Sequence, residues 1–360
     1  MMLRALNVAS DYMRAQLYAM SSIKRLSDIH LLWGPVYART SLGLGAKFFS
    51  LYSLAEVPRR TWSDYLDNEP LKARYAAMTS KEARRLADDK IKFFEHCRQH
   101  AIPTANIVAL ITRSAPGAST IPHVLSAQEL ASVLVPGTYF VKPSNGSHGK
   151  GTFSLSVTSS GVQWSGGNSG SFEDLARYCE AALQFTTTLI VQPKLSNHHL
   201  ITNITQAKGL STVRVVTVRQ AGRIEVIAGA FRIVVGESDV DNFSHGASGN
   251  LVAGVDVATG KMITSIGSRS KSWPSMKDVA VHPATGATIV GVQLPYWPEV
   301  LALVTKAHES IDNLHTVGWD VAILESGPVI VEANWRYDID ILQVAYKKGF
   351  RKVLDEKLPG

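Results

Sequence analysis

The stretch GWDVAILESGPVIVEANWRYD, residues 318–338, contains two apolar runs separated by a Glu-Ser-Gly-Pro turn. Successive residues of a strand point to opposite faces of a sheet. On the second run, Glu332 and Asn334 therefore share one face, and apolar side chains share the other. On the first run, Asp320 lies among apolar neighbours. The stretch predicts a β-hairpin that carries two carboxylates and an amide on otherwise apolar strands.

These three side chains have the chemistry of a magnesium site. An acidic residue inside an apolar strand costs free energy unless it is paired or binds a metal ion. Asp320, Glu332 and Asn334 offer only oxygen ligands, which suit Mg²⁺ bridging phosphates and not zinc. We therefore expect them to bind Mg²⁺. The alternative is a structural salt bridge from this face to a nearby arginine.

The length of the turn decides whether both acids can bind one ion. A two-residue turn over Ser326 and Gly327 would leave the carboxylates on opposite faces. A three-residue turn that ends at Gly327 pairs Leu324 with Pro328, and so pairs Asp320 with Glu332. Three-residue hairpin turns commonly end with glycine in the left-handed conformation, so we predict this turn and a positive φ at Gly327. A bulge elsewhere in the hairpin would also restore the register.

A second stretch, FVKPSNGSHGKG at residues 140–151, predicts a glycine-rich hairpin tip. The sequence lacks both the GxxxxGK[ST] phosphate loop and the GxGxxG dinucleotide fingerprint. The strand-like run 152–157 follows the tip, where those motifs would have a helix. Backbone N–H groups of such a tip close over an anion, and Lys142 would point a charge at the same anion. The alternative is a mobile surface hairpin.

Size, cysteine content and hydropathy limit the classes of protein. A chain of 360 residues predicts two or three subdomains. Cys97 and Cys179 are too far apart for a CxxC zinc site, and two cysteines do not make a disulfide scaffold, so we expect a reducing cytoplasm. No 18-residue run is both predominantly apolar and free of charge, so we expect no stable membrane insertion.

The positive charge is concentrated in the first part of the chain. The net charge is +7, and residues 1–100 hold 16 Lys and Arg against 10 Asp and Glu. A solvated basic helical surface explains this pattern, and a face for an anionic substrate or polymer is the alternative. No nucleic-acid-binding motif is present, so nucleic acid is not an expected partner.

The remaining sequence predicts an α+β protein. Residues 1–80 are predicted to be helical, and 79–100 is a stronger helix that begins at Thr79 or Ser80 and carries an apolar stripe. Residues 106–112 are predicted to be a strand. Helices are predicted near 172–185 and 298–313. Further strands are predicted at 138–143, 152–157, 188–193, 212–219, 224–235, 319–324 and 328–334. The strands favour antiparallel hairpins over a regular strand–helix alternation.

The order of these motifs resembles the ATP-grasp superfamily. It runs from Lys90 through VKP at 141–143 with its glycine-rich loop and the apolar strand LIVQPKL at 189–195 to the 318–338 hairpin. Further segments resemble the sugar-transfer-associated branch of that superfamily. They are TVRVVT (212–217), DNFSHGASG (241–249), VDVATGK (255–261), HPATG (282–286), LPYWPE (294–299) and GWDVAI (318–323). The resemblance covers about residues 80–360. It implies an ATP-grasp fold, in which two α+β subdomains grip ATP, here with an N-terminal helical region.

The resemblance also implies roles for individual residues. Lys90 and Lys142 would hold the phosphates of ATP, and Arg214 would face the γ-phosphate and the intermediate. Apart from the resemblance, Arg336 directly follows the strand with Glu332 and Asn334, and we expect it to bind a substrate carboxylate. Asp320, Glu332 and Asn334 would bind Mg²⁺. The expected cover over the triphosphate is the 146–151 loop, with Ser147, His148, Gly149, Lys150 and Gly151. The expected adenine and ribose contacts are Gln192, Pro193, Lys194, Leu195 and His199.

Three features are specific to this chain. Many ATP-grasp enzymes have a glutamate where Gln192 stands, and glutamine keeps the acceptor oxygen without the charge. His198 and His199 occupy the region where a ribose-binding acid often lies, with a surface pair as the alternative. DNFSHGASG places Ser244 and His245 among glycines, either in a substrate pocket or in turns that need such residues.

The expected function follows from these roles. We expect an ATP-dependent, ADP-forming carboxylate–amine ligase that acts through an acyl phosphate on a sugar acid or polysaccharide precursor. A carboxylate–thiol ligase, an ATP-dependent phosphotransferase and a non-catalytic nucleotide-binding module are the alternatives. The expected regions are a helical region (1–80), a small α/β segment (81–135), a small ATP-grasp subdomain (136–195) and a large one with the metal site (196–360). We expect a cytoplasmic homodimer.

Overall fold

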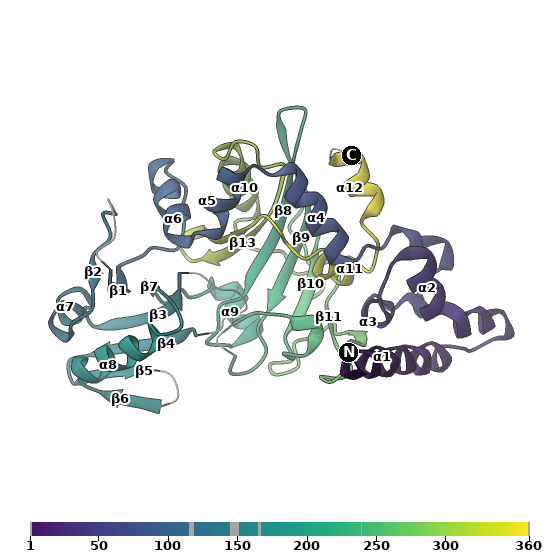
Figure 1. Cartoon of the computed structure of the whole chain (residues 1–360), viewed down its shortest axis with the longest axis horizontal. Helices are drawn as coiled ribbons and strands as arrows, with labels where there is room; N and C mark the ends of the chain where they lie inside the picture. Colours follow the sequence, from purple (N-terminus) through teal and green to yellow (C-terminus); the bar gives the residue numbers. More distant parts are fainter. Residues whose placement is uncertain (1, 115–118, 145–150, 165–166, 239, 359–360) are drawn as a thin grey trace.

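The computed structural model describes residues 2–114, 119–144, 151–164, 167–238 and 240–358 (Figure 1). The α-helices are α1 Met2–Ser21, α2 Gly34–Leu42, α3 Ala46–Leu51, α4 Asn68–Met78, α5 Lys81–Asp88, α6 Lys90–Gln99, α7 Ala127–Val133, α8 Phe172–Ala182, α9 His199–Thr205, α10 Trp297–Glu309, α11 Asp340–Tyr346 and α12 Arg351–Lys357. The strands are β1 Ala109–Thr112, β2 His123–Val124, β3 Gly137–Pro143, β4 Phe153–Thr158, β5 Gly161–Trp164, β6 Asn168–Gly170, β7 Thr188–Pro193, β8 Thr212–Gln220, β9 Arg223–Ile233, β10 Leu251–Val255, β11 Ile266–Ser268, β12 Met276–Asp278, β13 Thr316–Leu324 and β14 Gly327–Asn334. The predicted α+β class is confirmed.

The first sheet has the strand order β2-β1-β7-β3-β4-β5-β6 and lies at one end of the molecule (Figure 1). Its pairs are antiparallel apart from the parallel pair β1–β2. Val141 and Leu155 of the sheet share a core with Leu130 of α7 and Leu175 of α8. The expected boundary between residues 135 and 136 therefore runs through one sheet, because β1 and β2 pair into it.

The second sheet has the order β12-β11-β10-β9-β8-β13-β14 and forms the middle of the molecule. Its two faces are buried against different layers. Val213 and Trp319 share one core with Trp297 and Val304 of α10. Val216 of the opposite face belongs to a separate core. Alternate residues of β8 therefore enter different layers, as the two-residue period of a strand requires.

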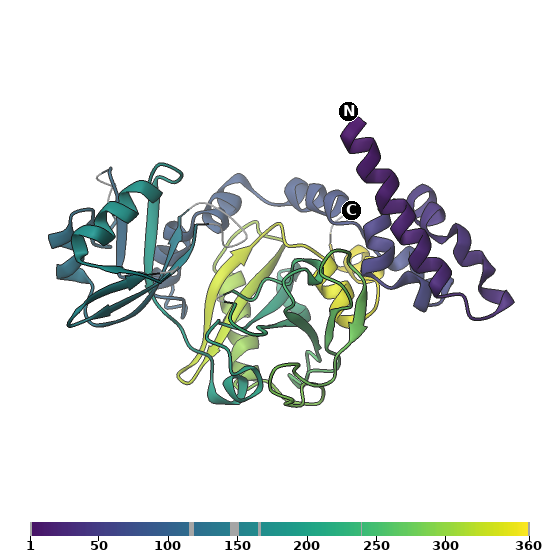
Figure 2. The ribbon, with the colours of Figure 1, turned by 90° about the horizontal axis from the view of Figure 1, so that it is seen from below.

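Helices α11 and α12 pack against that opposite face, and the N-terminal helices lie beside these two helices in the same core (Figures 1 and 2). Phe49, Trp62 and Tyr75 are buried in one core with Val216 and Leu354. The helical region predicted for residues 1–80 is confirmed, and it is packed into the large subdomain. No helix of the described ranges is both long and apolar enough to cross a membrane.

The β13–β14 hairpin has a shorter turn than the sequence predicts. Leu324 pairs with Gly327, so the turn contains two residues, Glu325 and Ser326. The predicted three-residue turn, with Leu324 opposite Pro328, is therefore wrong. The predicted positive φ at Gly327 is confirmed at +112°.

The predicted pairing of the two acids is nevertheless correct. The register shifts by one residue between Asp320 and Val321, so that Val321 pairs with Ile330 and Asp320 pairs with Glu332. A β-bulge has this effect because it opposes two residues of one strand to one of its partner. The bulge, not the turn, brings both carboxylates to the same position along the hairpin.

The helix predicted for residues 79–100 is two helices. Ser80 caps α5 by accepting a hydrogen bond from the Ala83 N–H, as expected. Asp89 leaves the helical conformation and caps α6 by accepting hydrogen bonds from the N–H groups of Ile91 and Lys92. An aspartate forms such a cap readily, which the apolar stripe does not reveal. The break places Lys90 at the first position of α6.

Candidate active site

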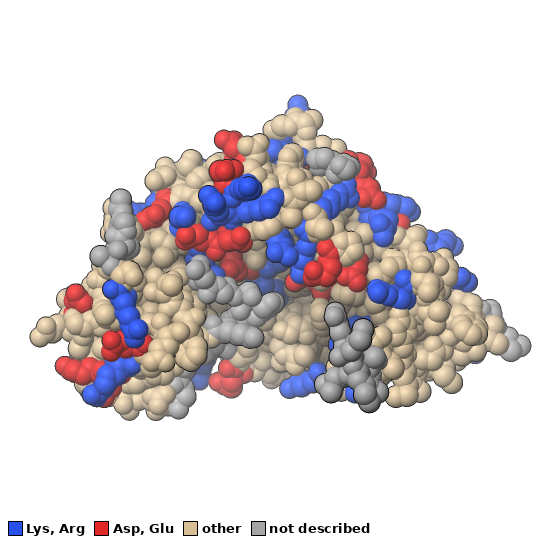
Figure 3. All heavy atoms as spheres, viewed as in Figure 1, with Lys and Arg blue, Asp and Glu red and all other residues tan. Residues whose placement is uncertain are grey.

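One cavity of about 800 Å³ lies among the two sheets and the N-terminal helices. Figure 3 shows basic and acidic side chains meeting around a hollow near the middle of one face. The charged and polar residues that line the cavity form two groups of opposite net charge. The basic end contains Lys90, Lys142, Lys194, Arg214 and Arg232 together with Asp241, Asp320, Glu332 and Asn334. The acidic end contains Asp67, Asn68, Glu69, Asp338 and Asp340 together with Phe48, Lys72, His245 and Arg336.

Lys90 and Lys142 meet Glu332 at the basic end. The Nζ atom of Lys90 lies 3.4 Å from Oε1 of Glu332. Burial lowers the pKa of Lys142 to about 8; Glu332 acts against this shift and Lys90 adds to it. Two amines beside one carboxylate leave positive charge for an anionic ligand, such as a polyphosphate.

Asp320 is the centre of a buried network. It is 4% exposed and forms hydrogen-bonded ion pairs with Arg214 of β8 and Arg232 of β9. Burial opposes the charged form of Asp320, but the two guanidinium groups outweigh it and hold its pKa below the usual value. The amide nitrogen of Asn334 also donates to Oδ2 of Asp320, at 3.3 Å. The salt bridge that was the structural alternative for this face is therefore present at Asp320.

Arg232 and Asp241 are site residues that the motifs do not reveal. Nε of Arg232 lies 3.2 Å from Oδ2 of Asp241, and the same carboxylate oxygen accepts a hydrogen bond from the Thr212 N–H at 2.9 Å. Arg232 interrupts the apolar strand 224–235 just as Asp320 interrupts its own strand. The same argument about a buried charge would have found it.

The segment from Gln192 to Leu195 lines the cavity at the end of β7. The side chain of Gln192 is directed to the backbone and donates to the Ala105 carbonyl at 2.9 Å. The Lys194 N–H donates to the Thr138 carbonyl, and its Nζ donates to Ser154 Oγ at 3.2 Å. Adenine contacts by this segment would therefore use backbone groups other than the Lys194 N–H.

The acidic end joins four segments that are far apart in the sequence. Lys72 of α4 lies 2.7 Å from Asp338 and 3.3 Å from Glu69. Asn68 Oδ1 accepts hydrogen bonds from the N–H groups of Ile339 and Asp340, at 2.9 and 3.3 Å. The N-terminal helices thus hold the segment that follows β14.

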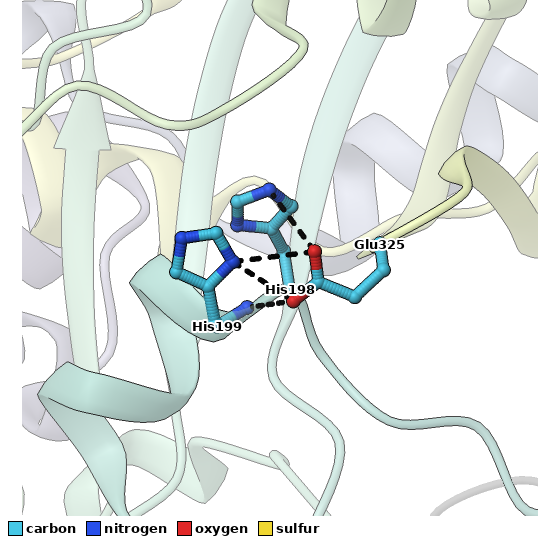
Figure 4. A group of neighbouring side chains, drawn as sticks. All are labelled: His198, His199 and Glu325. Atoms are coloured by element: carbon cyan, nitrogen blue, oxygen red, sulfur yellow. Dashed lines mark hydrogen bonds and ion pairs between the residues drawn. The ribbon is translucent and has the colours of Figure 1, made fainter.

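His199 lies away from this cavity. Figure 4 shows His198, His199 and Glu325 as a cluster whose ligand atoms lie within 4.8 Å of one another. Glu325 accepts hydrogen bonds from the His199 N–H and from its ring. His198 Nδ1 accepts from the Leu200 N–H, so the neutral ring carries its proton on Nε2, which faces Glu325. A protonated nitrogen cannot bind a metal ion, so these contacts make the cluster a cap on α9.

Most of the expected phosphate cover, residues 146–150 with Ser147, His148, Gly149 and Lys150, lies outside the described residues. The strands on both sides form the predicted hairpin, since Val141 pairs with Phe153. Gly151 has φ of +74°, which glycine adopts at no steric cost.

Cysteine chemistry has no support in this cavity. Cys97 and Cys179 are buried in separate cores. Burial raises the pKa of both thiols to about 12. A thiol with such a pKa is a poor nucleophile at neutral pH, because the thiolate is the reactive form.

Comparison with solved structures finds proteins of low sequence identity. D-alanyl-alanine synthetase A from Vibrio cholerae O1 biovar eltor has 12% identity and a TM-score of 0.44, and the match covers 78% of this chain and 63% of that one. Carboxyaminoimidazole ribonucleotide synthase from Aspergillus clavatus, complexed with ATP, has 14% identity and a TM-score of 0.44, with 82% and 59% covered. This chain thus spans less than two thirds of either protein.

Comparison with protein families gives a match over most of the chain. No curated protein matches the sequence. The model of the family described as sugar-transfer associated ATP-grasp matches residues 71–357, which contain both sheets. The resemblance predicted from the motifs is confirmed. The chain therefore belongs to the sugar-transfer associated ATP-grasp family and has the ATP-grasp fold.

Proposed function

We propose that the protein is an ATP-dependent ligase that joins a carboxylate to an amine through an acyl phosphate and releases ADP. The observation that carries this proposal is the basic end of the cavity. There Lys90, Lys142 and Arg214 lie around the carboxylates of Asp320 and Glu332. A complex of magnesium and triphosphate needs cations that bind the phosphates and oxygen ligands nearby that bind the metal ion.

The chemistry requires two steps. A carboxylate is a poor acceptor for an amine, because its leaving group would be oxide. In the first step a carboxylate oxygen attacks the γ-phosphorus of ATP, the bond to the β-phosphate breaks, and ADP leaves. In the second step the amine attacks the acyl carbon and phosphate leaves. The protein contributes positioning and charge neutralisation to both steps.

Three cations of the basic end and two neighbouring segments have roles in this scheme. Lys90 and Lys142 hold phosphates, and Arg214 faces the γ-phosphate and the acyl phosphate. The segment from Gln192 to Leu195 contacts adenine through its backbone. The 146–151 loop covers the triphosphate, and excluding water there protects the acyl phosphate from hydrolysis.

The donor set fits magnesium. Asp320, Glu332 and Asn334 line one cavity and supply two carboxylates and an amide oxygen. The network that holds Asp320 also contains Arg214 and Arg232, so binding of Mg²⁺ at Asp320 means that one of these contacts is exchanged. Bound Mg²⁺ would neutralise negative charge on the β- and γ-phosphates.

The acid substrate is proposed to be a sugar acid or a polysaccharide precursor. The description of the family, which links it to sugar transfer, supports this choice. Arg336 lines the cavity beside the hairpin that carries the metal ligands, and it is the residue proposed to bind the carboxylate of the acid.

The test combines ADP release with a chemical trap. Purified protein, Mg²⁺ and ATP are mixed with D-glucuronate, D-galacturonate, L-glutamate or D-alanine, each with and without hydroxylamine. We expect one acid to give ADP and a hydroxamate in equal amounts, because hydroxylamine captures an acyl phosphate. ADP release that no acid stimulates would refute the ligase. ADP release with a phosphorylated hydroxyl product would identify a phosphotransferase instead.

Paired lysine variants provide the control. Lys142→Ala should abolish hydroxamate formation, because Lys142 is proposed to hold the phosphates. Lys208→Ala should leave it unchanged, since Lys208 is an exposed residue paired with Glu237 on the surface. Equal rates in the two variants would remove Lys142 from the site.

A further inference from the structure

A histidine–aspartate pair lies at the acidic end of the cavity, opposite the groups that the proposed function uses. Nε2 of His245 lies 2.6 Å from Oδ2 of Asp340. Asp340 is 5% exposed, and its other oxygen accepts a hydrogen bond from the Ile341 N–H. The carboxylate is thus fixed from two sides, while the His245 side chain is 49% exposed and lines the cavity.

The hydrogen bond decides which nitrogen of His245 can accept a proton. A carboxylate accepts, so in the neutral ring the proton is on Nε2 and the lone pair is on Nδ1. Among the described residues, none forms a hydrogen bond to Nδ1 of His245. Asp340 therefore orients the ring and leaves its basic nitrogen available to a molecule in the cavity.

The backbone around His245 has a conformation that costs free energy. Ser244 and His245 have φ of +47° and +54°, in the left-handed region, and the following Gly246 has φ of +85°. Non-glycine residues in this conformation are strained, and they are concentrated at functional sites. A Cβ atom at Gly246 would lie 2.6 Å from the Cβ of Ser268, so this turn also requires glycine. The ring is held in place by Phe48, whose edge faces it at a centroid distance of 6.2 Å.

The charges near His245 favour its protonated form. The hydrogen bond to Asp340 raises the pKa of the imidazole, burial opposes the rise, the charges of Asp340 and Asp338 add to it, and Lys47 acts against it. These groups come from α11, the segment before it, and α3, while the neutral Phe48 packs against the ring. A base with a raised pKa takes a proton more readily.

The same end of the cavity suits a cation. Asp67, Glu69, Asp338 and Asp340 line it, against Lys72 and Arg336 as its fixed positive charges. An alkyl amine is an ammonium ion at neutral pH, so it would be attracted here and would need to lose a proton before it could attack.

We infer that His245, oriented by Asp340, is the general base that deprotonates an ammonium substrate bound at the acidic end. This inference rests on the proposed ligase function and adds to it the place where the amine binds and the residue that deprotonates it. The ammonium ion gives one proton to Nδ1 of His245. The neutral amine then forms the C–N bond with the acyl carbon while the C–O bond to phosphate breaks. The second proton of the nitrogen leaves with the phosphate, as hydrogen phosphate.

The variant His245→Gly tests this role and keeps the backbone relaxed, because glycine adopts the left-handed conformation freely. Ammonium, glycine and ethanolamine serve as amine probes with the acid found by the hydroxylamine trap. We expect amide formation to fall by about 10²–10⁴-fold, the usual contribution of a general base. Hydroxamate formation should change little, because hydroxylamine is largely unprotonated at neutral pH. Added imidazole should restore part of the amide formation.

The control variant is His100→Asn, which changes an exposed histidine of the segment after α6. It should form amide and hydroxamate as the wild type does. The inference is overturned if His245→Gly forms amide normally, or if it loses amide and hydroxamate equally. Wild-type protein that forms hydroxamate but no amide with any of the three amines also overturns it. Absence of hydroxamate from wild type with every acid is a failure of the proposed function itself.

A second measurement needs no substrate. Diethyl pyrocarbonate acylates unprotonated imidazole nitrogen, and peptide mass mapping follows the reaction at His245 alone. We expect the reaction to decline as the pH falls through the raised pKa of His245. In Asp340→Asn that midpoint should move to lower pH, and the low-pH limb of amide formation should move with it. A midpoint unchanged by Asp340→Asn, or a His245 that does not react, would refute the pair.

Discussion

The basic and acidic ends of the cavity differ in how the chain builds them. Apart from Asp241, the acids and arginines of the basic end lie on the neighbouring strands β9, β8, β13 and β14. The acidic end is assembled from α3, the start of α4, the turn at 244–246 and the segment after β14. Its Asn68–Ile339 contact joins residues 271 apart in the chain. A sheet thus presents one end in a regular pattern, and helix packing creates the other.

This difference determines what holds each end together. The buried network at Asp320 depends on strand register, and a bulge corrects that register. The acidic end depends on a core that the N-terminal helices share with β8, β9 and the C-terminal helices. The two ends should therefore respond differently to the same kind of damage.

Deleting residues 1–78 should have the largest effect. It removes the buried side chains of Phe49, Trp62, Tyr65 and Tyr75 from a core that includes Val216. Truncating one such aromatic residue to alanine lowers the free energy of unfolding by about 3–5 kcal/mol. The whole free energy of unfolding of a domain is only about 5–15 kcal/mol. We expect no stable fold, measured by soluble yield and by thermal melting beside the full chain. A soluble 79–360 fragment that melts cooperatively and binds ATP would contradict this, because it would show that the fold and the basic end do not need the N-terminal helices.

The next effect distinguishes two acids within the basic end. Asp320→Asn should lower the free energy of unfolding by about 3–5 kcal/mol, because two buried guanidinium groups lose their partner. Glu332→Gln should lower it by at most about 1 kcal/mol, because its ion pair with Lys90 is partly exposed. Urea titration of both variants measures this. If the two variants lose the same free energy of unfolding, the loss depends on position in the strand and not on the buried ion pairs with arginine. Both variants should lose ADP formation if the carboxylates bind Mg²⁺.

Lys142→Ala should weaken ATP binding without changing the fold. Loss of a charged contact to phosphate costs about 1.5–3 kcal/mol, or at least tenfold in affinity. Glu69→Gln, at the other end of the cavity, should leave the affinity for ATP unchanged. Titration calorimetry with Mg-ATP compares the two. If both variants bind ATP equally, the division of the cavity into two functional ends is wrong.

The smallest effect is a proton taken up when ATP binds. The pKa of Lys142 is lowered to about 8 from its ordinary 10.5, so between these values the free protein has a largely neutral amine. Phosphate favours the charged amine, so binding near pH 9 should take up as much as one proton, and binding near pH 6 should take up none. Calorimetry in two buffers of different ionisation enthalpy measures the uptake. Binding heats that do not depend on the buffer at pH 9 would contradict it, and Lys142→Ala should abolish the dependence.

The sequence predicts the strands that build the basic end, including β8, β9, β13 and β14, but it misses the shorter strands β2, β5, β6, β10, β11 and β12. Asp320, Glu332 and Asn334 interrupt apolar runs, and alternation along a strand assigns their faces without knowledge of tertiary contacts. The pairing of Asp320 with Glu332 was right although the turn was wrong, because the bulge compensates for one residue. Asp89 broke the predicted helix because a cap depends on one side chain and not on periodicity.

The acidic end could not be predicted in the same way. The sequence places His245 among turn residues, which leaves pocket and turn as open alternatives. Its partner Asp340 is 95 residues away, in a helix with no motif. Only the packing of the N-terminal helices against the second sheet brings α4 beside this segment. No local sequence pattern predicts that α4 contacts the segment after β14, because only the tertiary core brings the two together.

The Asn68–Ile339 contact has a consequence for how the protein is made. The ribosome releases the N-terminal helices long before it has polymerised the residues that cover them. At about 5–20 residues per second, a separation of 271 residues corresponds to roughly 15–50 s of elongation. During that time the apolar faces of the nascent helices have no native partner. We expect the growing chain to depend on chaperones, and its acidic end to form only after the segment that contains Asp340 has left the ribosome.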